Sequence, residues 1–76
     1  MNLTKGEFSQ FNLKSRIQIL LKKGILLGAK KISRIYEIRL FSLYGFYVKV
    51  VFNKPKNEIQ SAEPLLNKSM LNLYLH

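Results

Sequence analysis

The chain has 76 residues, and its 13 lysines and arginines are opposed by only four acidic residues, all glutamate, so its formal net charge is +9. It has no cysteine and one histidine, His76, which excludes a disulfide scaffold and leaves almost nothing to hold a structural metal. Hydrophobic residues make up 47% of the chain, more than a disordered basic tail carries. We therefore expect one small folded domain, 1–76, that gains stability from a negatively charged partner.

Residues 1–11 are mostly polar and are predicted to form a loose N-terminal arm, with Phe8 and Phe11 pinning it to the body. This start lacks the apolar run and the small-residue cleavage site of a signal peptide. No apolar run in the chain approaches the roughly 20 residues that a membrane span needs. Because cysteine is also absent, the expected location is the cytoplasm.

An amphipathic helix is predicted for residues 13–23, with Asn12 as its N-cap and Gly24 at the C′ position after its end. Its apolar residues recur at offsets of four, seven and eight, the spacing of one helical stripe. That stripe consists of Leu13, Ile17, Leu20 and Leu21. Basic residues lie off the stripe, and two of them fall in the last turn, where they complement the helix dipole.

After Gly24 the apolar pattern changes to a period of two, rich in β-branched and aromatic residues, which is typical of strands. Tyr44-Gly45 predicts a tight hairpin turn, and the segment 53–57 predicts a type I turn whose last residue tolerates the left-handed region. Pro64 is expected to end the last strand. The predicted strands are 25–32, 34–43, 46–52 and 58–63.

The fold class that follows is α+β, with the helix packed on an antiparallel meander of three or four strands. The helix is expected to cover the even-numbered face of the two central strands, which carries Tyr36, Ile38, Leu40, Phe46, Val48, Val50 and Phe52. The other face would then carry Arg39, Tyr47 and Lys49. The tail, 64–76, has apolar residues at both helical and alternating spacing, so a short helix is favoured and an extended segment stays open.

Catalysis is disfavoured by the residue types present. Acid–base chemistry needs titratable groups that can be held together, and the chain offers four glutamates on separate elements and a terminal His76. Nothing orients that histidine against a serine, and no cluster has the spacing of a metal site. The glycines of the chain are too widely separated to form a phosphate-binding loop. The sequence therefore predicts no enzyme, cofactor or small-molecule substrate.

Basic residues concentrate near the predicted turns. The pair 22–23 and the segment 30–34 flank the first strand and are expected to form one positive rim, with Lys54 and Lys56 as a second positive tip. For any single lysine, a solvated guard of a strand edge is the favoured interpretation, but acids do not balance the set as a whole. The predicted nucleic-acid-binding residues are Lys14, Arg16, Lys22, Lys23, Lys30, Lys31, Arg34, Arg39, Tyr47, Lys49, Lys54 and Lys56.

Residues 43–53, LYGFYVKVVFN, followed by Asn57-Glu58-Ile59, resemble a group of short uncharacterised bacterial proteins built around a GFYVEVWYN…NKIEKI hairpin. The helix start is similar too, so the resemblance covers about residues 11–63. It implies the α+β meander and no activity. The chain has Lys49 where that pattern has an acidic residue, and Val51 where it has a large aromatic. We expect this face to have been redirected to a negatively charged partner.

Three functions are compatible with these features. The first is a structural RNA-binding protein, specifically a small lineage-restricted ribosomal protein that binds rRNA beside neighbouring proteins. The second is a protein-interaction module, such as an antitoxin-like partner or an accessory subunit, that docks through a sheet edge and the apolar tail. Binding to an anionic membrane ranks third, because the predicted helix is needed for the core.

Overall fold

A computed structural model of the chain describes residues 3–67. Within this range, helices α1 (Lys5–Gln10) and α2 (Leu13–Lys23) precede a sheet. The sheet consists of β1 (Ile25–Lys31), β2 (Tyr36–Leu43), β3 (Phe46–Asn53) and β4 (Glu58–Pro64). Neighbouring strands are antiparallel and follow the order β1-β2-β3-β4, so the chain forms a meander. The predicted α+β class and the four-stranded meander are confirmed.

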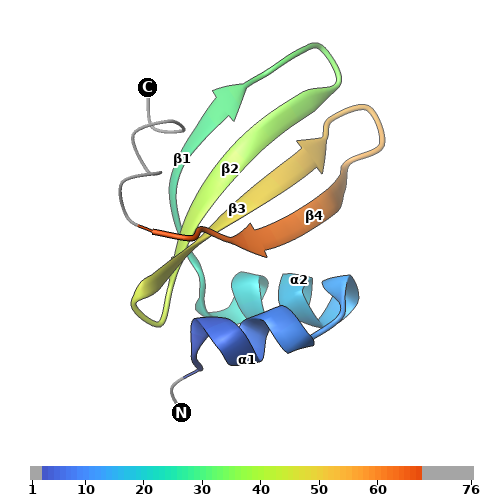
Figure 1. The fold of residues 1–76 in the computed structure, drawn as a ribbon. Coiled ribbons are helices and arrows are strands. Elements are labelled where there is room, and N and C mark those ends of the chain that lie inside the picture. Colours follow the sequence, from blue (N-terminus) through green and yellow to red (C-terminus); the bar gives the residue numbers. More distant parts are fainter. Residues whose placement is uncertain (1–2, 68–76) are drawn as a thin grey trace.

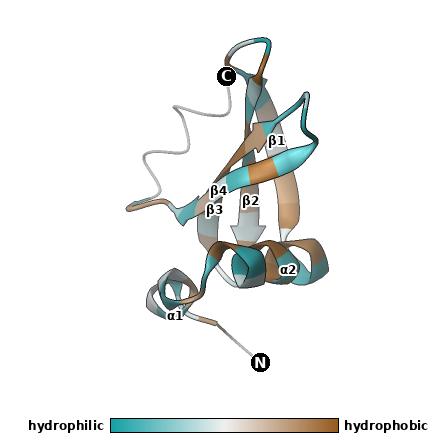
Figure 2. Ribbon diagram, turned by 90° about the vertical axis from the view of Figure 1, so that its right-hand side faces the viewer, coloured by the Kyte–Doolittle hydropathy of each residue, from teal (hydrophilic) through white to brown (hydrophobic). Residues whose placement is uncertain are grey.

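Both helices lie at one end of the sheet, and the β1–β2 and β3–β4 loops lie at the other (Figure 1). The same separation is visible from the side (Figure 2). It follows from the connectivity, because consecutive hairpin turns in a meander alternate between the two ends of the sheet. No helix within residues 3–67 is long and apolar enough to cross a membrane.

The loose arm predicted for the start of the chain is instead helix α1. Thr4 and Glu7 form a capping box, in which Glu7 N–H donates to Thr4 Oγ1 at 3.1 Å and Thr4 N–H donates to Glu7 Oε1 at 2.9 Å. Phe8 is fully buried, whereas Phe11 is 41% exposed. The helix forms because the cap satisfies its first donors and because Phe8 packs into the core.

The capping box predicts that the stability of α1 depends on pH. Hydrogen bonds from the Thr4 backbone N–H and then from its hydroxyl group lower the pKa of Glu7 from its ordinary value of 4.5. A carboxylate with a lowered folded-state pKa stabilises the fold above its unfolded pKa, and this stabilisation is lost as the pH falls through the folded value. We expect α1 to fray over that acidic range.

Carbon-13 NMR titration of Glu7 and amide exchange in α1 measure this effect. The variant Glu7→Gln keeps a side-chain acceptor but cannot titrate, so fraying of its α1 should no longer follow a titration at this position. A measured pKa of 4.5 or above for Glu7 would contradict the assignment.

Helix α2 begins as predicted, since the Asn12 side chain accepts a hydrogen bond from Ser15 N–H at 2.9 Å. Gly24 follows the helix, but its φ is −75° and not left-handed. It is required for a close approach, because a Cβ there would lie 2.6 Å from the Leu20 carbonyl oxygen. Leu20 is buried and Leu21 is 75% exposed. The predicted stripe is therefore corrected at Leu21, which lies beyond the edge of the face that α2 packs on the sheet.

The turn between β2 and β3 determines which residues share a face. Tyr44 and Gly45 have φ values of 49° and 86°, the backbone of the predicted two-residue hairpin turn. It places Leu43 opposite Phe46, so odd-numbered residues of β2 share a face with even-numbered residues of β3. The prediction that the even-numbered residues of both strands share one face is wrong. A two-residue loop pairs positions three apart in the chain, which always differ in parity.

The core lies where the helices meet the sheet. Its buried members come from both helices and from β2, β3 and β4, namely Phe8, Leu20, Leu43, Val48, Val50 and Ala62. Leu40 is also fully buried, but it lies outside this cluster, opposite Gly28 and Lys49 in the neighbouring strands. The core therefore anchors the helix end of the sheet and leaves the loop end to other contacts.

Beyond β4 the chain continues along β3 for one more residue. Leu65 N–H donates to the Tyr47 carbonyl at 2.9 Å, and the Leu65 side chain is buried. Lys5 Nζ donates to the carbonyls of Leu65 and Leu66 at 3.1 and 3.0 Å, which ties α1 to this segment. The short helix predicted within the C-terminal tail lies outside the described residues.

Candidate nucleic-acid interface

A backbone hydrogen bond joins the two loops at the far end of the sheet, from Lys54 N–H to the Ile35 carbonyl at 2.8 Å. This bond brings cations of both hairpins to one end of the molecule (Figure 1). We call this group the cationic end, and it consists of Lys30, Lys31, Arg34, Lys54 and Lys56. The sequence predicted two separate positive patches at these positions. The structure makes them one.

Local hydrogen bonds fix the backbone of these loops. Ser33 Oγ accepts a hydrogen bond from Tyr36 N–H at 3.1 Å. Asn53, which is buried, accepts one from Lys56 N–H through Oδ1 at 3.1 Å. Asn57 has a φ of 52°, the left-handed backbone predicted for the end of this turn. The cations therefore project from an ordered backbone.

No glutamate of residues 3–67 forms an ion pair with the cationic end, although Glu37 lies opposite Lys31 in the register of β1 and β2. Glu37 and Glu63 form ion pairs of 2.7 and 3.1 Å with arginines outside it. Glu7 belongs to the cap of α1, and Glu58 accepts a hydrogen bond from a glutamine at 3.1 Å. Within residues 3–67 no ion pair involves a member of the cationic end. Its positive charge is therefore available to a ligand.

Apolar and aromatic side chains are exposed beside these cations. Ile32 is 53% exposed, Ile35 is 47% exposed, and Tyr36 is 40% exposed. The alternating sequence pattern predicted Tyr36 on the covered face, so Tyr36 was not among the predicted binding residues. The sequence signal for a binding role of Tyr36 was its position directly after the turn that contains Ser33 and Arg34. A tyrosine ring among unpaired cations provides a surface on which a nucleic-acid base can stack.

Three other predicted residues lie elsewhere. Lys14, Lys22 and Lys23 are exposed on α2, at the opposite end of the sheet from the cationic end. The seven residues of β1 separate the end of α2 from Lys31, a span of about 23 Å at 3.3 Å per residue. The continuous rim predicted along this edge is therefore absent, because β1 is extended and its two ends face opposite ends of the sheet.

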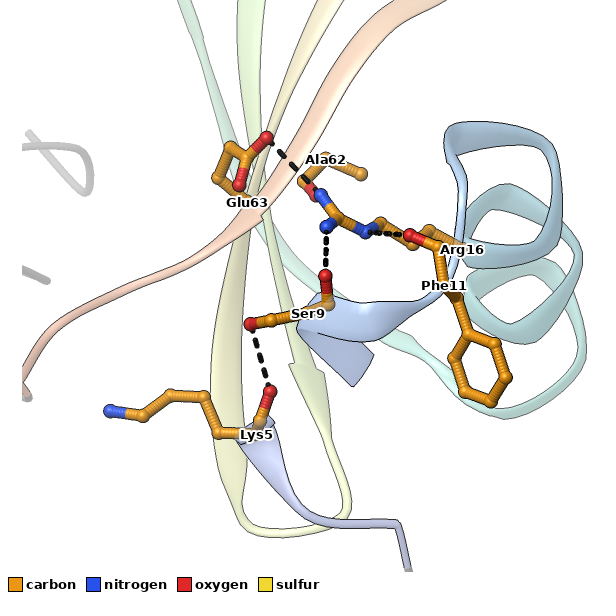
Figure 3. A network of polar contacts seen from close by, with 6 residues as sticks. All are labelled: Lys5, Ser9, Phe11, Arg16, Ala62 and Glu63. Carbon is orange, nitrogen blue, oxygen red and sulfur yellow. Dashed lines mark hydrogen bonds and ion pairs between the residues drawn. The ribbon is translucent and has the colours of Figure 1, made fainter. Parts of the chain in front are cut away.

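Arg16, also predicted to bind nucleic acid, is directed into the protein (Figure 3). Its guanidinium donates to the carbonyls of Phe11, Ala62 and Ser9 at 2.9, 2.8 and 2.7 Å. It also forms the ion pair with Glu63, and its side chain is only 13% exposed. Arg16 links α1, α2 and β4, so the candidate interface omits it.

Arg39, Tyr47 and Lys49 do not share a face as predicted. Arg39 lies opposite Val50, and its guanidinium lies 3.8 Å from the centre of the Phe52 ring. Tyr47 and Lys49 lie on the other face of the sheet and are half-buried. Lys49 also has an interaction partner. These residues are therefore poorer candidates for phosphate contacts than the cationic end.

Within the described range no group of three His, Cys, Asp or Glu side chains could hold a metal ion. Comparisons with protein-family models, with curated proteins and with solved structures gave no match.

Proposed function

We propose that this chain is a structural RNA-binding protein that contacts RNA phosphates with its cationic end. The observation that carries this proposal is the convergence of two hairpin loops, through the bond between Lys54 and Ile35, into one group of cations that has no ion pair with a glutamate of residues 3–67. Each phosphate that such a group neutralises releases condensed counterions, and this release drives association.

The size of the cationic end fits several nucleotides. The strands of a sheet lie about 4.8 Å apart, so the end of a four-stranded sheet is about 15 Å wide. Lysines and an arginine distributed over that width contact the backbone, and Tyr36 supplies a ring for one base. This arrangement favours backbone contacts with limited readout of sequence.

Ribosomal RNA is the RNA that we propose, in a cytoplasmic ribosome. A chain of 76 residues without disulfides has only a thin core, so it gains stability when a large polyanion binds one end of it. Gradient sedimentation of a cell lysate tests this step. Migration with a ribosomal subunit in high salt supports an rRNA partner. Free migration, combined with RNA binding by the purified protein, would show that the chain binds an RNA other than rRNA.

Neutralising three exposed members of the cationic end tests the RNA site itself. In the variant Lys31→Gln, Arg34→Gln, Lys56→Gln, we expect the affinity for a labelled single-stranded RNA to fall about 100-fold in 0.1 M salt. The slope of log affinity against log salt should decrease in magnitude by about 2, since each lost phosphate contact contributes about 0.7. Fluorescence anisotropy at several salt concentrations measures both quantities.

The matched control is Lys14→Gln, Lys22→Gln, Lys23→Gln, which removes the same charge from exposed positions on α2. It should retain most of the affinity. Equal losses in the two triple variants would show diffuse attraction to net charge and would contradict a localised site. Binding of the wild-type protein to anionic vesicles but not to RNA would show that the ligand is a membrane surface and not RNA.

A further inference from the structure

The first half of β1 is apolar and exposed. Ile25, Leu26 and Leu27 are 65%, 54% and 44% exposed, and Leu21, at the end of α2, is 75% exposed. Leu21 also lines a hollow of about 490 Å³ on α2 together with other residues of that helix. Three consecutive exposed apolar residues at the start of a strand, close in the chain to an exposed leucine of α2, are a candidate interaction surface.

β1 is also an edge strand, since among residues 3–67 it pairs with β2 and with no other strand. An edge strand has a second row of backbone N–H and C=O groups that can pair with an added strand, and proteins usually guard such edges with charges or proline. The apolar half of β1 has neither. Its only irregularity is the bulge between Leu26 and Gly28.

The opposite edge of the sheet is guarded. β4 carries Glu58 and Glu63 and ends in Pro64. Arg16 donates a hydrogen bond to the carbonyl of Ala62 on the same strand at 2.8 Å. β1 carries charges only in its second half, at Lys30 and Lys31, so the two edges differ beside the helices, where the first half of β1 is apolar and open.

Charge disfavours a second copy of the chain as the partner. An antiparallel register that sets the apolar half of β1 against its copy also brings Lys22 and Lys23 of each chain toward Lys30 and Lys31 of the other. A parallel register sets Lys30 and Lys31 beside their own copies. Like charges opposite one another on paired strands are destabilising, and each chain already carries a net charge of +9.

We propose that β1 binds an acidic, extended segment of a partner protein by strand addition. The added strand runs antiparallel to β1, with apolar side chains beside Ile25 and Leu27 and carboxylates beside Lys30 and Lys31. Backbone hydrogen bonds supply affinity, and the alternate side chains supply selectivity. This surface is separate from the RNA site except at Lys30 and Lys31, which belong to both.

The test uses the full chain, labelled with nitrogen-15, and a synthetic peptide of two glutamates followed by alternating valine and threonine. We expect the peptide to shift the amide resonances of β1 and of the end of α2 and to slow amide exchange in β1. A control peptide with lysine in place of glutamate should bind at least about tenfold more weakly.

The double variant Ile25→Gln, Leu27→Gln should weaken peptide binding at least about tenfold and leave RNA affinity unchanged. Its matched control, Ile32→Gln, Ile35→Gln, removes similar apolar surface at the loop end and should bind the peptide normally. All four side chains are exposed, so both variants should fold, which circular dichroism checks.

Several results would overturn the proposal without affecting the RNA site. These are no peptide binding, peptide-induced shifts confined to the cationic end, or equal losses in the two double variants. A dimer in sedimentation equilibrium that Ile25→Gln, Leu27→Gln dissociates would assign the edge to a second copy. Protection of β1 amides by RNA and not by the peptide would assign it to RNA.

Discussion

Replacing Phe8 with alanine is expected to destabilise the protein by about 3–5 kcal/mol, the usual cost of deleting a buried phenylalanine ring. The Phe8 side chain is 0% exposed, and its ring centre lies 5.7 Å from that of Phe46. The Arg16 guanidinium lies 5.5 Å from the same ring. Alanine would leave a cavity between α1 and the sheet, where no other side chain of α1 is buried. Thermal unfolding should show a midpoint lowered by at least about 12 °C.

Phe11 provides the matched control, because it is the other phenylalanine near α1 and is 41% exposed. We expect Phe11→Ala to cost no more than about 1 kcal/mol. If the two variants unfolded at the same temperature, α1 would not be packed as described, and residues 1–11 would form the loose arm predicted from the sequence.

Replacing Arg16 with methionine should cost about 3 kcal/mol, nearly as much as losing Phe8. Methionine keeps the aliphatic part of the side chain and removes every donor, so the carbonyls of Ser9, Phe11 and Ala62 lose charged hydrogen bonds. Hydrogen bonds to charged groups contribute about 1.5–3 kcal/mol each and do not add fully. Urea unfolding, with circular dichroism as the signal, measures the change.

Two further variants separate the hydrogen bonds of Arg16 from its ion pair. Glu63 is 59% exposed at its side chain, so Glu63→Gln should cost less than about 1 kcal/mol. Lys14→Met, on an exposed site of the same helix, should change the free energy of unfolding by about 0.5 kcal/mol or less. A loss in Glu63→Gln as large as in Arg16→Met would show that the ion pair, and not the carbonyl contacts, holds the helices on β4.

The core and the proposed RNA site lie at opposite ends of this molecule. Phe8 and Arg16 act where the helices meet the sheet, and the cationic end lies at the far end of the sheet, in the last residues of β1 and the two loops. Substitutions in the loops should therefore change RNA affinity with little effect on the midpoint of unfolding. The same separation explains why Arg16, although basic, belongs to the fold and not to the interface.

The sequence alone determined the features that depend on nearby residues. The Asn12 cap, the bounds of α2 and the positive φ values of Gly45 and Asn57 follow from local chemistry and were predicted. The strands also agree with prediction to within two residues at either end. Net charge and the lack of catalytic residue types pointed to a polyanion as partner before any geometry was known.

Helix α1 was missed although its sequence carried a signal. Thr4 and Glu7 have the spacing of a capping box, but a helix of six residues is unstable by itself. It forms because Phe8 is buried against strands far away in the chain. Whether such a segment becomes helical depends on the free energy of that contact, which local propensity does not contain.

The face that Arg39 shares with Val50 follows from the two-residue turn that the sequence predicted, but only the tertiary structure decided which cations lie at one end. The two-residue turn sets Arg39 opposite Val50, and the alternation of hairpin turns brings Arg34 and Lys56 to one end. The strand order also leaves β1 at one edge of the sheet, with Leu26 and Leu27 exposed. Composition determined that the chain is cationic, but register and strand order, which join residues distant in sequence, determined where that charge can act.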